Sequence, residues 1–121
     1  MRALLDTNIL IDYLNGVAQS RNEVEKREAP AISIITWMEV MTGAGDSDEE
    51  NQLRMFLSRF QVIGIDSEIA ALAVKLRREH RMKLPDAIIY ASAKARQMLL
   101  VTRNSKDFRP QMDGVAIPYQ L

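Results

Sequence analysis

The chain has 121 residues, of which 47% are hydrophobic and 26% are charged. This is the composition of a folded globular protein, and the length suits one domain over residues 1–121. The absence of cysteine excludes disulfide bonds, zinc–thiolate sites and thiol catalysis. Sixteen basic and sixteen acidic residues give a formal net charge of +0, so no global field attracts a polyanion.

The apolar segment at the amino terminus is a candidate targeting signal, but its pattern argues against one. Asp6, Asn8 and Asp12 interrupt it, and no small-residue cleavage pattern follows. No window of the sequence is long and apolar enough to span a bilayer. We therefore expect a cytoplasmic protein with no membrane partner.

Short apolar segments alternate with helical patterns along the chain. The short apolar segments predict buried strands at residues 3–5, 31–34, 61–65, 98–102 and 115–117. Apolar residues at helical spacing and capping signals predict the helices. These are a helix capped by Thr7 or Asn8, a polar helix over residues 18–28, a helix opened by Thr36 to Glu39, one that follows the acidic run 46–50, one over residues 66–81 and one opened by Leu84-Pro85-Asp86.

This alternation predicts an α/β fold class with a mostly parallel central sheet. Right-handed crossovers between parallel strands place helices on both faces of such a sheet. Ligands of open parallel sheets bind beyond the carboxyl ends of the strands. Asp6 directly follows the first predicted strand, so it lies where this fold places its chemistry.

Three acidic residues occupy related positions at this edge. Asp6 follows a strand, and Glu39 and Asp86 are expected in the first turns of helices. Structural roles also explain them: Asp6 caps a helix, and Asp86 complements a helix dipole. Glu39 can complete a capping box with Thr36. Three carboxylates that converge repel each other, which favours a bound cation, and an all-oxygen site suits Mg²⁺ or Mn²⁺.

Nearby polar residues are candidates for supporting roles in such a site. Asn104 or Asp107, after the fourth predicted strand, can add an oxygen ligand, and the residues leave that choice open. Thr7, Asn8 and Thr102 can hydrogen-bond the ligands from a second shell, with helix capping as the competing role. A divalent cation held by carboxylates can activate water and stabilise charge during phosphodiester hydrolysis.

Basic and apolar clusters offer candidate binding surfaces, although clustered charges are also typical of a solvated helix face. Met55, Phe56 and Leu57 are adjacent apolar residues on one helix, which a partner surface or tight core packing explains. His80 is the only histidine, and we expect it at a helix end rather than in catalysis. The basic clusters are Arg77, Arg78, Arg81 and Lys83, and then Arg103, Lys106 and Arg109, which Lys94 and Arg96 can extend.

Four segments spread over nearly the whole chain carry a family resemblance. They are Leu5-Asp6-Thr7-Asn8, Trp37-Met38-Glu39-Val40, Leu84-Pro85-Asp86-Ala87-Ile88-Ile89-Tyr90-Ala91 and Val101-Thr102-Arg103-Asn104-x-x-Asp107-Phe108. In this order and spacing they resemble PIN-domain proteins, and most closely the VapC toxins of prokaryotic toxin–antitoxin pairs. The resemblance implies a three-layer α/β/α sandwich and a Mg²⁺- or Mn²⁺-dependent endoribonuclease. It also implies a homodimer that a cognate antitoxin inhibits.

The resemblance carries over to individual residues. Asp6, Glu39 and Asp86 match the three core acids, which implies that they are catalytic metal ligands. A fourth acidic position of the family aligns with Asn104, with Asp107 nearby, and this departure bears on whether a second metal binds tightly.

The implied substrate is a structured RNA such as tRNA. The basic loop that follows the fourth predicted strand is expected to contact it. The residues of this loop that we predict to bind RNA are Arg103, Lys106 and Arg109.

Two other functions use the same residues. In a non-catalytic, PIN-like protein-interaction module, the carboxylates are caps and bind no metal. In a phosphatase, Asp6 is a nucleophile, but the Asp-x-Asp motif of the haloacid dehalogenase family is Asp6-x-Asn8 here, which disfavours this function.

Overall fold

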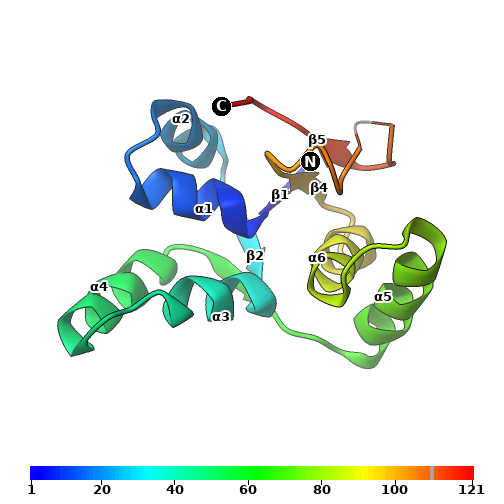
Figure 1. Cartoon of the computed structure of the whole chain (residues 1–121), viewed down its shortest axis with the longest axis horizontal. Coiled ribbons are helices and arrows are strands. Elements are labelled where there is room, and N and C mark those ends of the chain that lie inside the picture. Colours follow the sequence, from blue (N-terminus) through cyan, green and yellow to red (C-terminus); the bar gives the residue numbers. More distant parts are fainter. Residues whose placement is uncertain (110) are drawn as a thin grey trace.

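The computed structural model describes residues 1–109 and 111–121, and a five-stranded sheet lies at its centre (Figure 1). Every pair of neighbouring strands is parallel, which confirms the predicted parallel sheet. The strands are β1 (Ala3–Leu5), β2 (Ala31–Ser33), β3 (Gln61–Ile63), β4 (Leu99–Val101) and β5 (Val115–Ala116). The helices are α1 (Thr7–Leu14), α2 (Ala18–Lys26), α3 (Ile34–Thr42), α4 (Ser47–Leu57), α5 (Ser67–His80) and α6 (Leu84–Ala95).

The strands send alternate side chains to two separate cores, because successive side chains of a strand point to opposite faces. Leu4 of β1 and Leu100 of β4 pack in the core beneath α5 and α6. Ala3 and Leu5 pack on the other face, with residues of α1 to α4. The helices therefore cover both faces of the sheet, which confirms the three-layer α/β/α sandwich.

The strand order is β3-β2-β1-β4-β5, so the direction of strand addition reverses between β1 and β4. Such a reversal leaves a crevice at the carboxyl ends of the two strands, where open α/β sheets bind ligands. Asp6 follows β1 and Thr102 follows β4, so both residues lie at this crevice. The topology thus selects one place on the sheet for chemistry.

Two predicted helix starts differ from the structure. Of the caps considered for α1, Thr7 and Asn8 are wrong and Asp6 is confirmed, since its carboxylate accepts a hydrogen bond from the Thr7 amide. The N-cap of α3 is Ser33, whose hydroxyl accepts from the Ile35 amide, so the helix begins at Ile34. Glu39 therefore lies in the second turn of α3, and it forms no capping box with Thr36. The cause is that β2 passes directly into α3 without a loop.

The adjacent apolar residues of α4 belong mostly to the core. Leu57 is buried, and Phe56 packs against Tyr13 and Phe60 with ring centroids 5.2 and 5.4 Å apart. Only Met55 of the three is strongly exposed, at 77%. Core packing thus accounts for two of these side chains.

His80 is the last residue of α5, as expected, and it lies edge-on to the Tyr90 ring. Among the described residues, 1–109 and 111–121, no helix is both long enough and apolar enough to cross a membrane.

Candidate active site at the carboxyl edge of the sheet

Asp6 is buried at the crevice, with only 4% of its surface exposed. Its Oδ1 accepts from the Thr7 amide at 2.8 Å. Its Oδ2 accepts from the Thr102 hydroxyl at 2.7 Å and from Asn8 Nδ2 at 3.2 Å. These bonds occupy three of the roughly four acceptor positions of a carboxylate, so one position on Oδ1 stays open. The sequence places Asp6 here because β1 and α1 meet at this residue without a loop.

Thr102 and Asn8 fix the orientation of the Asp6 carboxylate. The Thr102 hydroxyl accepts from Asn8 Nδ2 at 3.2 Å and from the Asn104 amide at 3.0 Å. Both of its acceptor positions are therefore occupied, so its only proton must go to Asp6. The structure thus brings the predicted neighbours of Asp6 into direct contact with it.

Electrostatics set Asp6 apart from an ordinary surface carboxylate. Burial raises the pKa of Asp6 from 3.8 to about 6, and the charges of Asp86 and Glu39 act in the same direction. Hydrogen bonds from Thr102 and Thr7 offset part of this shift. The three acids predicted to act together therefore influence one another across the crevice.

Glu39 reaches the site from the second turn of α3. Its Oε1 accepts from the Thr7 hydroxyl at 2.7 Å, and that hydroxyl is also 2.9 Å from the hydroxyl of Thr36. Thr36 is fully buried and was not predicted as a site residue. Thr36 was interpreted as the partner of Glu39 in a capping box, so its contact with Thr7 was not predicted.

Asp86 lies in the first turn of α6, as predicted, and is half-buried. Burial raises the pKa of Asp86, and the charges of Asp107 and Glu39 raise it further, while Lys83 lowers it. The charge of Asp107 therefore acts on the acid cluster. Asn104 binds Asp107 twice: its Nδ2 donates to Asp107 Oδ2 at 3.0 Å, and its Oδ1 accepts from the Asp107 amide at 3.1 Å.

The acids fit a hard divalent cation in their chemistry, because all available donors are oxygen atoms. Asp6 keeps one open acceptor position, and neither Glu39 Oε2 nor the Asp86 carboxylate accepts a hydrogen bond within the described part of the chain. As the side chains stand, however, no three Asp, Glu, His or Cys residues among those described converge on one ion position.

Arg103 forms an ion pair with Asp12, and neither Asp12 nor its second partner, Tyr119, was predicted to belong to the site. Arg103 donates to both carboxylate oxygens of Asp12, from Nε at 2.6 Å and from Nη2 at 3.0 Å. The Tyr119 hydroxyl donates to the same carboxylate at 2.7 Å. Burial alone would raise the pKa of Asp12, but these hydrogen bonds and the charge of Arg103 lower it below its ordinary value. The sequence signal for Asp12 was its position four residues after Asn8, which places both residues on the same face of the predicted helix.

The predicted RNA-contacting residues therefore differ in their surroundings. The Arg103 guanidinium is occupied by Asp12, whereas Lys106 and Arg109 are exposed and form no ion pair with any described residue. In the second basic cluster, Lys94 pairs with Asp113, and Arg96 pairs with Asp66 and Glu68.

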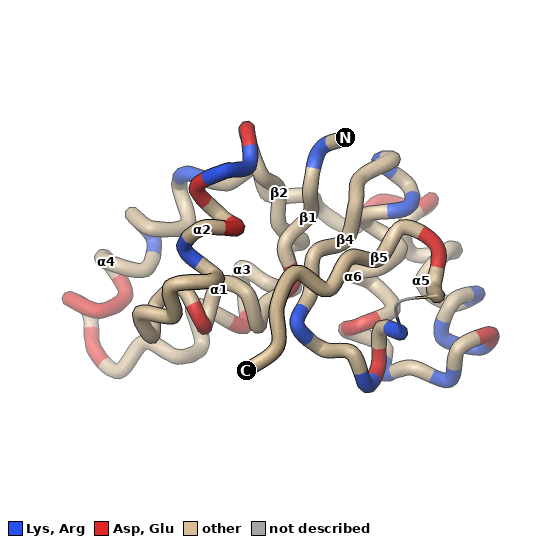
Figure 2. The backbone as a smooth tube through the Cα atoms, turned by 90° about the horizontal axis from the view of Figure 1, so that it is seen from above, with Lys and Arg blue, Asp and Glu red and all other residues tan. Residues whose placement is uncertain are grey.

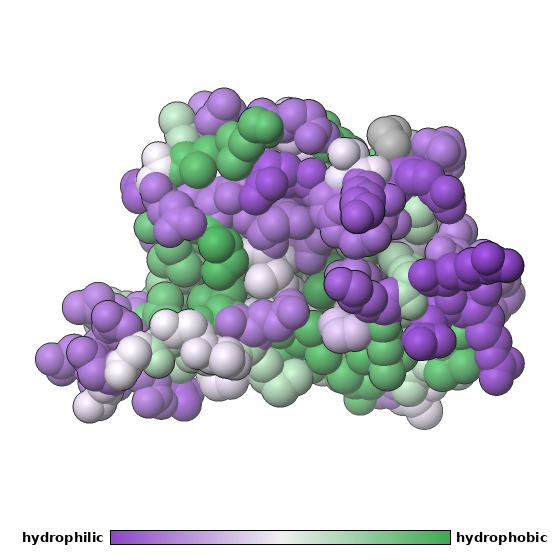
Figure 3. All heavy atoms as spheres, in the orientation of Figure 1, coloured by the Kyte–Doolittle hydropathy of each residue, from purple (hydrophilic) through white to green (hydrophobic). Residues whose placement is uncertain are grey.

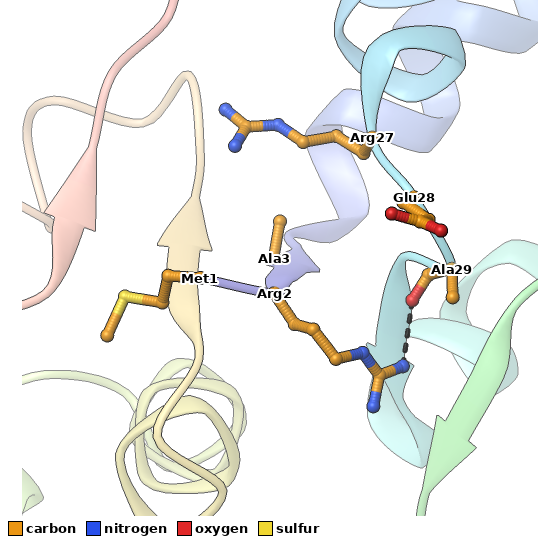
Figure 4. Close-up of a pocket in the computed structure, with 6 residues that line it drawn as sticks. All are labelled: Met1, Arg2, Ala3, Arg27, Glu28 and Ala29. Carbon is orange, nitrogen blue, oxygen red and sulfur yellow. Dashed lines mark hydrogen bonds between the residues drawn. The ribbon is translucent and has the colours of Figure 1, made fainter.

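The opposite edge of the sheet has different chemistry (Figure 4). A cavity of about 360 Å³ lies there, at the amino ends of β1 and β2, and its charged lining consists of Arg2, Arg27 and Glu28. Arg2 donates to the Ala29 carbonyl oxygen at 2.7 Å. The lining of this cavity thus has one carboxylate and two guanidinium groups, in contrast to the cluster of acids at the carboxyl edge.

Known proteins share this architecture. The chain is 32% identical over 112 residues to Ribonuclease VapC1 of Methanocaldococcus jannaschii, covering 88% of this chain and 79% of that protein. It is 31% identical over 119 residues to the tRNA(fMet)-specific endonuclease VapC of Shigella flexneri, covering 89% and 90%. A chain of a toxin–antitoxin complex from Klebsiella pneumoniae superposes with a TM-score of 0.93 at 48% identity, covering 98% and 99%.

The family model described as the PIN domain matches residues 3–110, which is most of the chain. The matched region spans the switch point of the sheet and includes Asp6, Glu39, Asp86 and Asp107. The chain therefore belongs to the PIN-domain family.

Proposed function

We propose that this protein is an endoribonuclease that requires a divalent cation, with Asp6, Glu39 and Asp86 as its catalytic metal ligands. One observation carries the proposal: the fold holds Asp6 where ionisation of its carboxylate is unfavourable, beside two further acids. Shifted pKa values of this kind are typical of functional sites. The family and the relatives named ribonuclease and endonuclease support the reaction class.

A comparison with a second helix cap supports a functional role for Asp6. Asp66 caps α5, and its pKa is lowered, first by a hydrogen bond from Arg96 and then by the Ile69 amide. A cap that only stabilises a helix has this character. The raised pKa of Asp6 instead costs the metal-free fold about 3 kcal/mol at pH 7. This cost disfavours the non-catalytic alternative, in which the acids are merely caps.

The residues of the chain prepare the site for phosphodiester hydrolysis. Thr102 and Asn8 hold the Asp6 carboxylate in one orientation, and Thr7 holds Glu39 beside it. Mg²⁺ or Mn²⁺, when bound, supplies a more acidic water and neutralises charge on the attacked phosphate. Lys83 lies close enough to lower the pKa of Asp86, so it can attract a phosphate to the same place.

The substrate and partners follow from the relatives. We propose tRNA as substrate because the Shigella flexneri relative is named for cleavage of tRNA(fMet). We propose a cognate antitoxin as partner because the Klebsiella pneumoniae chain was solved in a toxin–antitoxin complex. A homodimer belongs to the same proposal, and light scattering of the purified protein tests it.

Removal of the metal is the direct test of this function. We expect the purified protein to cleave tRNA with Mg²⁺ or Mn²⁺ and to lose cleavage in excess EDTA, because the acids then repel rather than share a cation. Added Mg²⁺ should restore cleavage. Sequencing the RNA ends identifies the substrate and the cleaved bond. Undiminished cleavage in EDTA contradicts the proposed metal dependence.

The fourth acidic position can be assigned by comparing two variants. We propose Asp107 as the additional acid, because its charge acts on Asp86, and Asn104 as the residue that holds it. Asp107→Asn should lower kcat about 10- to 100-fold. Asn104→Ser retains an acceptor for the Asp107 amide and should stay within about threefold of wild type. Steady-state kinetics at saturating Mg²⁺ measures both, and a larger loss for Asn104→Ser reverses the assignment.

Basic residues are concentrated in the part of the chain that carries Asp86 and Asp107. The segment from Lys75 to Arg109 contains ten of the sixteen Lys and Arg residues but only three of the sixteen acidic ones. Figure 2 shows basic residues around α5 and in the loop after β4, whereas acidic residues gather at the start of α4. Strongly hydrophilic residues also cover the α5 side in Figure 3. We propose that this face binds RNA phosphates through Lys83, whose charge acts on Asp86, and Lys106, which precedes Asp107 in the sequence.

Charge reversal on this face should weaken RNA binding. We expect Lys83→Glu/Lys106→Glu to raise KM at least tenfold and to reduce the salt dependence of RNA binding, because two phosphate contacts are lost. The matched control is Lys26→Glu/Arg54→Glu, which changes the net charge equally at residues that lie outside this segment and pair with Glu23 and Glu50. Titration of tRNA at several salt concentrations in EDTA measures binding alone. Equal weakening by both variants indicates a net-charge effect and excludes a local surface.

A further inference from the structure

Three segments that are distant in the sequence meet at the buried carboxylate of Asp12. Asp12 lies on α1 and is 4% exposed, Arg103 follows β4, and Tyr119 follows β5. Asp12 accepts two hydrogen bonds from Arg103 and one from Tyr119, at 2.6 to 3.0 Å. These contacts join the carboxyl-terminal segment to the helix that begins at Asp6.

Arg103 is held at two points along α1. Its side chain binds Asp12, and its backbone amide donates to Asn8 Oδ1 at 3.0 Å. Asn8 and Asp12 are four residues apart, so they lie on the same face of the helix, one turn from each other. The ion pair with Asp12 therefore sets the position of the amide that Asn8 meets.

The orientation of the Asn8 side chain depends on that amide. Because Asn8 Oδ1 accepts from Arg103, the Nδ2 group must point to the other side, where it donates to Asp6 Oδ2 and to Thr102 Oγ1. A reversed side-chain amide would place an acceptor against the Asp6 carboxylate. The Asp6 carboxylate thus favours the same orientation, and the Arg103 amide reinforces it from the other end of the Asn8 side chain.

We propose that Asp12, Arg103 and Tyr119 are positioning residues that keep the Asn8 amide directed at Asp6. A buried ion pair contributes little net stability compared with well-packed apolar residues. Its connection to Asp6 through Asn8 gives it a second use, since partners that orient a ligand are needed for full activity. The proposal rests on Asp6 being a metal ligand of the proposed nuclease. It also makes the carboxyl-terminal segment, through Tyr119, part of the support of the site.

The test compares two variants with matched controls. Asp12→Asn removes the ion pair, and Tyr119→Phe removes one hydroxyl and leaves the packing almost unchanged. The control for the first is Asp66→Asn, which breaks an ion pair with Arg96 away from the site. The control for the second is Tyr13→Phe, which removes a hydroxyl that accepts from Arg59. We expect kcat for RNA to fall about tenfold in Asp12→Asn and about threefold in Tyr119→Phe, with KM unchanged.

A readout independent of activity is the nuclear magnetic resonance signal of the Asn8 side-chain amide in metal-free protein. In wild type its protons should exchange slowly, and in both variants they should shift and exchange faster, while the controls leave them unchanged. If wild type cleaves no RNA, the proposed function fails, but this signal still tests the positioning. Unchanged Asn8 signals in Asp12→Asn overturn the proposal. An equal loss of kcat in Asp66→Asn also overturns it, because loss of stability then accounts for the effect.

Discussion

Asp6→Asn should abolish RNA cleavage, with a loss of at least about 1,000-fold in kcat/KM, or about 4 kcal/mol of transition-state stabilisation. Asp6 lies at the centre of the acid cluster, and its one open acceptor position is on a carboxylate oxygen. The amide of Asn is a weaker ligand than a carboxylate for a hard cation. Activity should be measured with Mg²⁺ and with Mn²⁺, on the tRNA that wild type cleaves.

The same variant should stay folded. The substitution weakens the hydrogen bond from Thr102, which lowers the stability. It also removes a charge that is costly to bury, and this gain offsets the loss. We expect the free energy of unfolding without metal to stay within about 1 kcal/mol of wild type. The matched control is Asp46→Asn, which changes the N-cap of α4 without touching the site. Full activity in Asp6→Asn contradicts the proposed role of Asp6.

Arg103→Ala should destabilise the fold by about 2–3 kcal/mol at pH 7, because it leaves the buried Asp12 carboxylate with Tyr119 as its remaining charge-stabilising partner. Urea unfolding measures this difference. The control is Arg96→Ala, which breaks exposed ion pairs with Asp66 and Glu68. Exposed pairs contribute about 0–1 kcal/mol, so the control should lose less.

The loss in Arg103→Ala should shrink in acid. In wild type the pKa of Asp12 is lowered from 3.8, so its stabilising contribution is present above that value and disappears as the pH falls through the lowered one. Without Arg103, burial dominates and raises the pKa of Asp12, so protonation relieves the variant as the pH falls. Urea unfolding of wild type and Arg103→Ala at pH 7 and at about pH 3 measures how their difference in stability changes with pH. A difference that does not depend on pH contradicts the role assigned to the Asp12 charge.

A double variant separates the charge from the contacts. Arg103→Ala/Asp12→Asn removes both partners, so no unpaired charge remains buried. We expect it to be more stable at pH 7 than Arg103→Ala alone. If the double variant is the less stable of the two, the cost lies in lost packing rather than in the buried charge of Asp12.

Local patterns were sufficient to predict the architecture and two of the acids. Short apolar segments alternating with helical periodicity predicted the parallel α/β sheet, because both periodicities depend only on neighbouring residues. Asp6 and Asp86 were predicted at the carboxyl edge because each is adjacent to the end of a strand or the start of a helix. Glu39 reaches the cluster from the second turn of α3 instead of the predicted first turn.

The tertiary structure shows what the loop residues contact. The sequence left Asn104 and Asp107 as alternatives; in the structure Asn104 hydrogen-bonds Asp107, whose charge raises the pKa of Asp86, and the assignment of Asp107 as the additional acid stays a prediction. Arg103 was predicted to bind RNA, yet its guanidinium lies on Asp12, which is 91 positions away in the sequence.

By itself the sequence determined which residues form strands and helices, and which acids stand at their ends, because these features are encoded within a few neighbouring residues. Only the tertiary structure decided which polar side chains hold one another. Asp12, Arg103 and Tyr119 meet because the strand order places β4 and β5 beside β1, and no local pattern encodes that order.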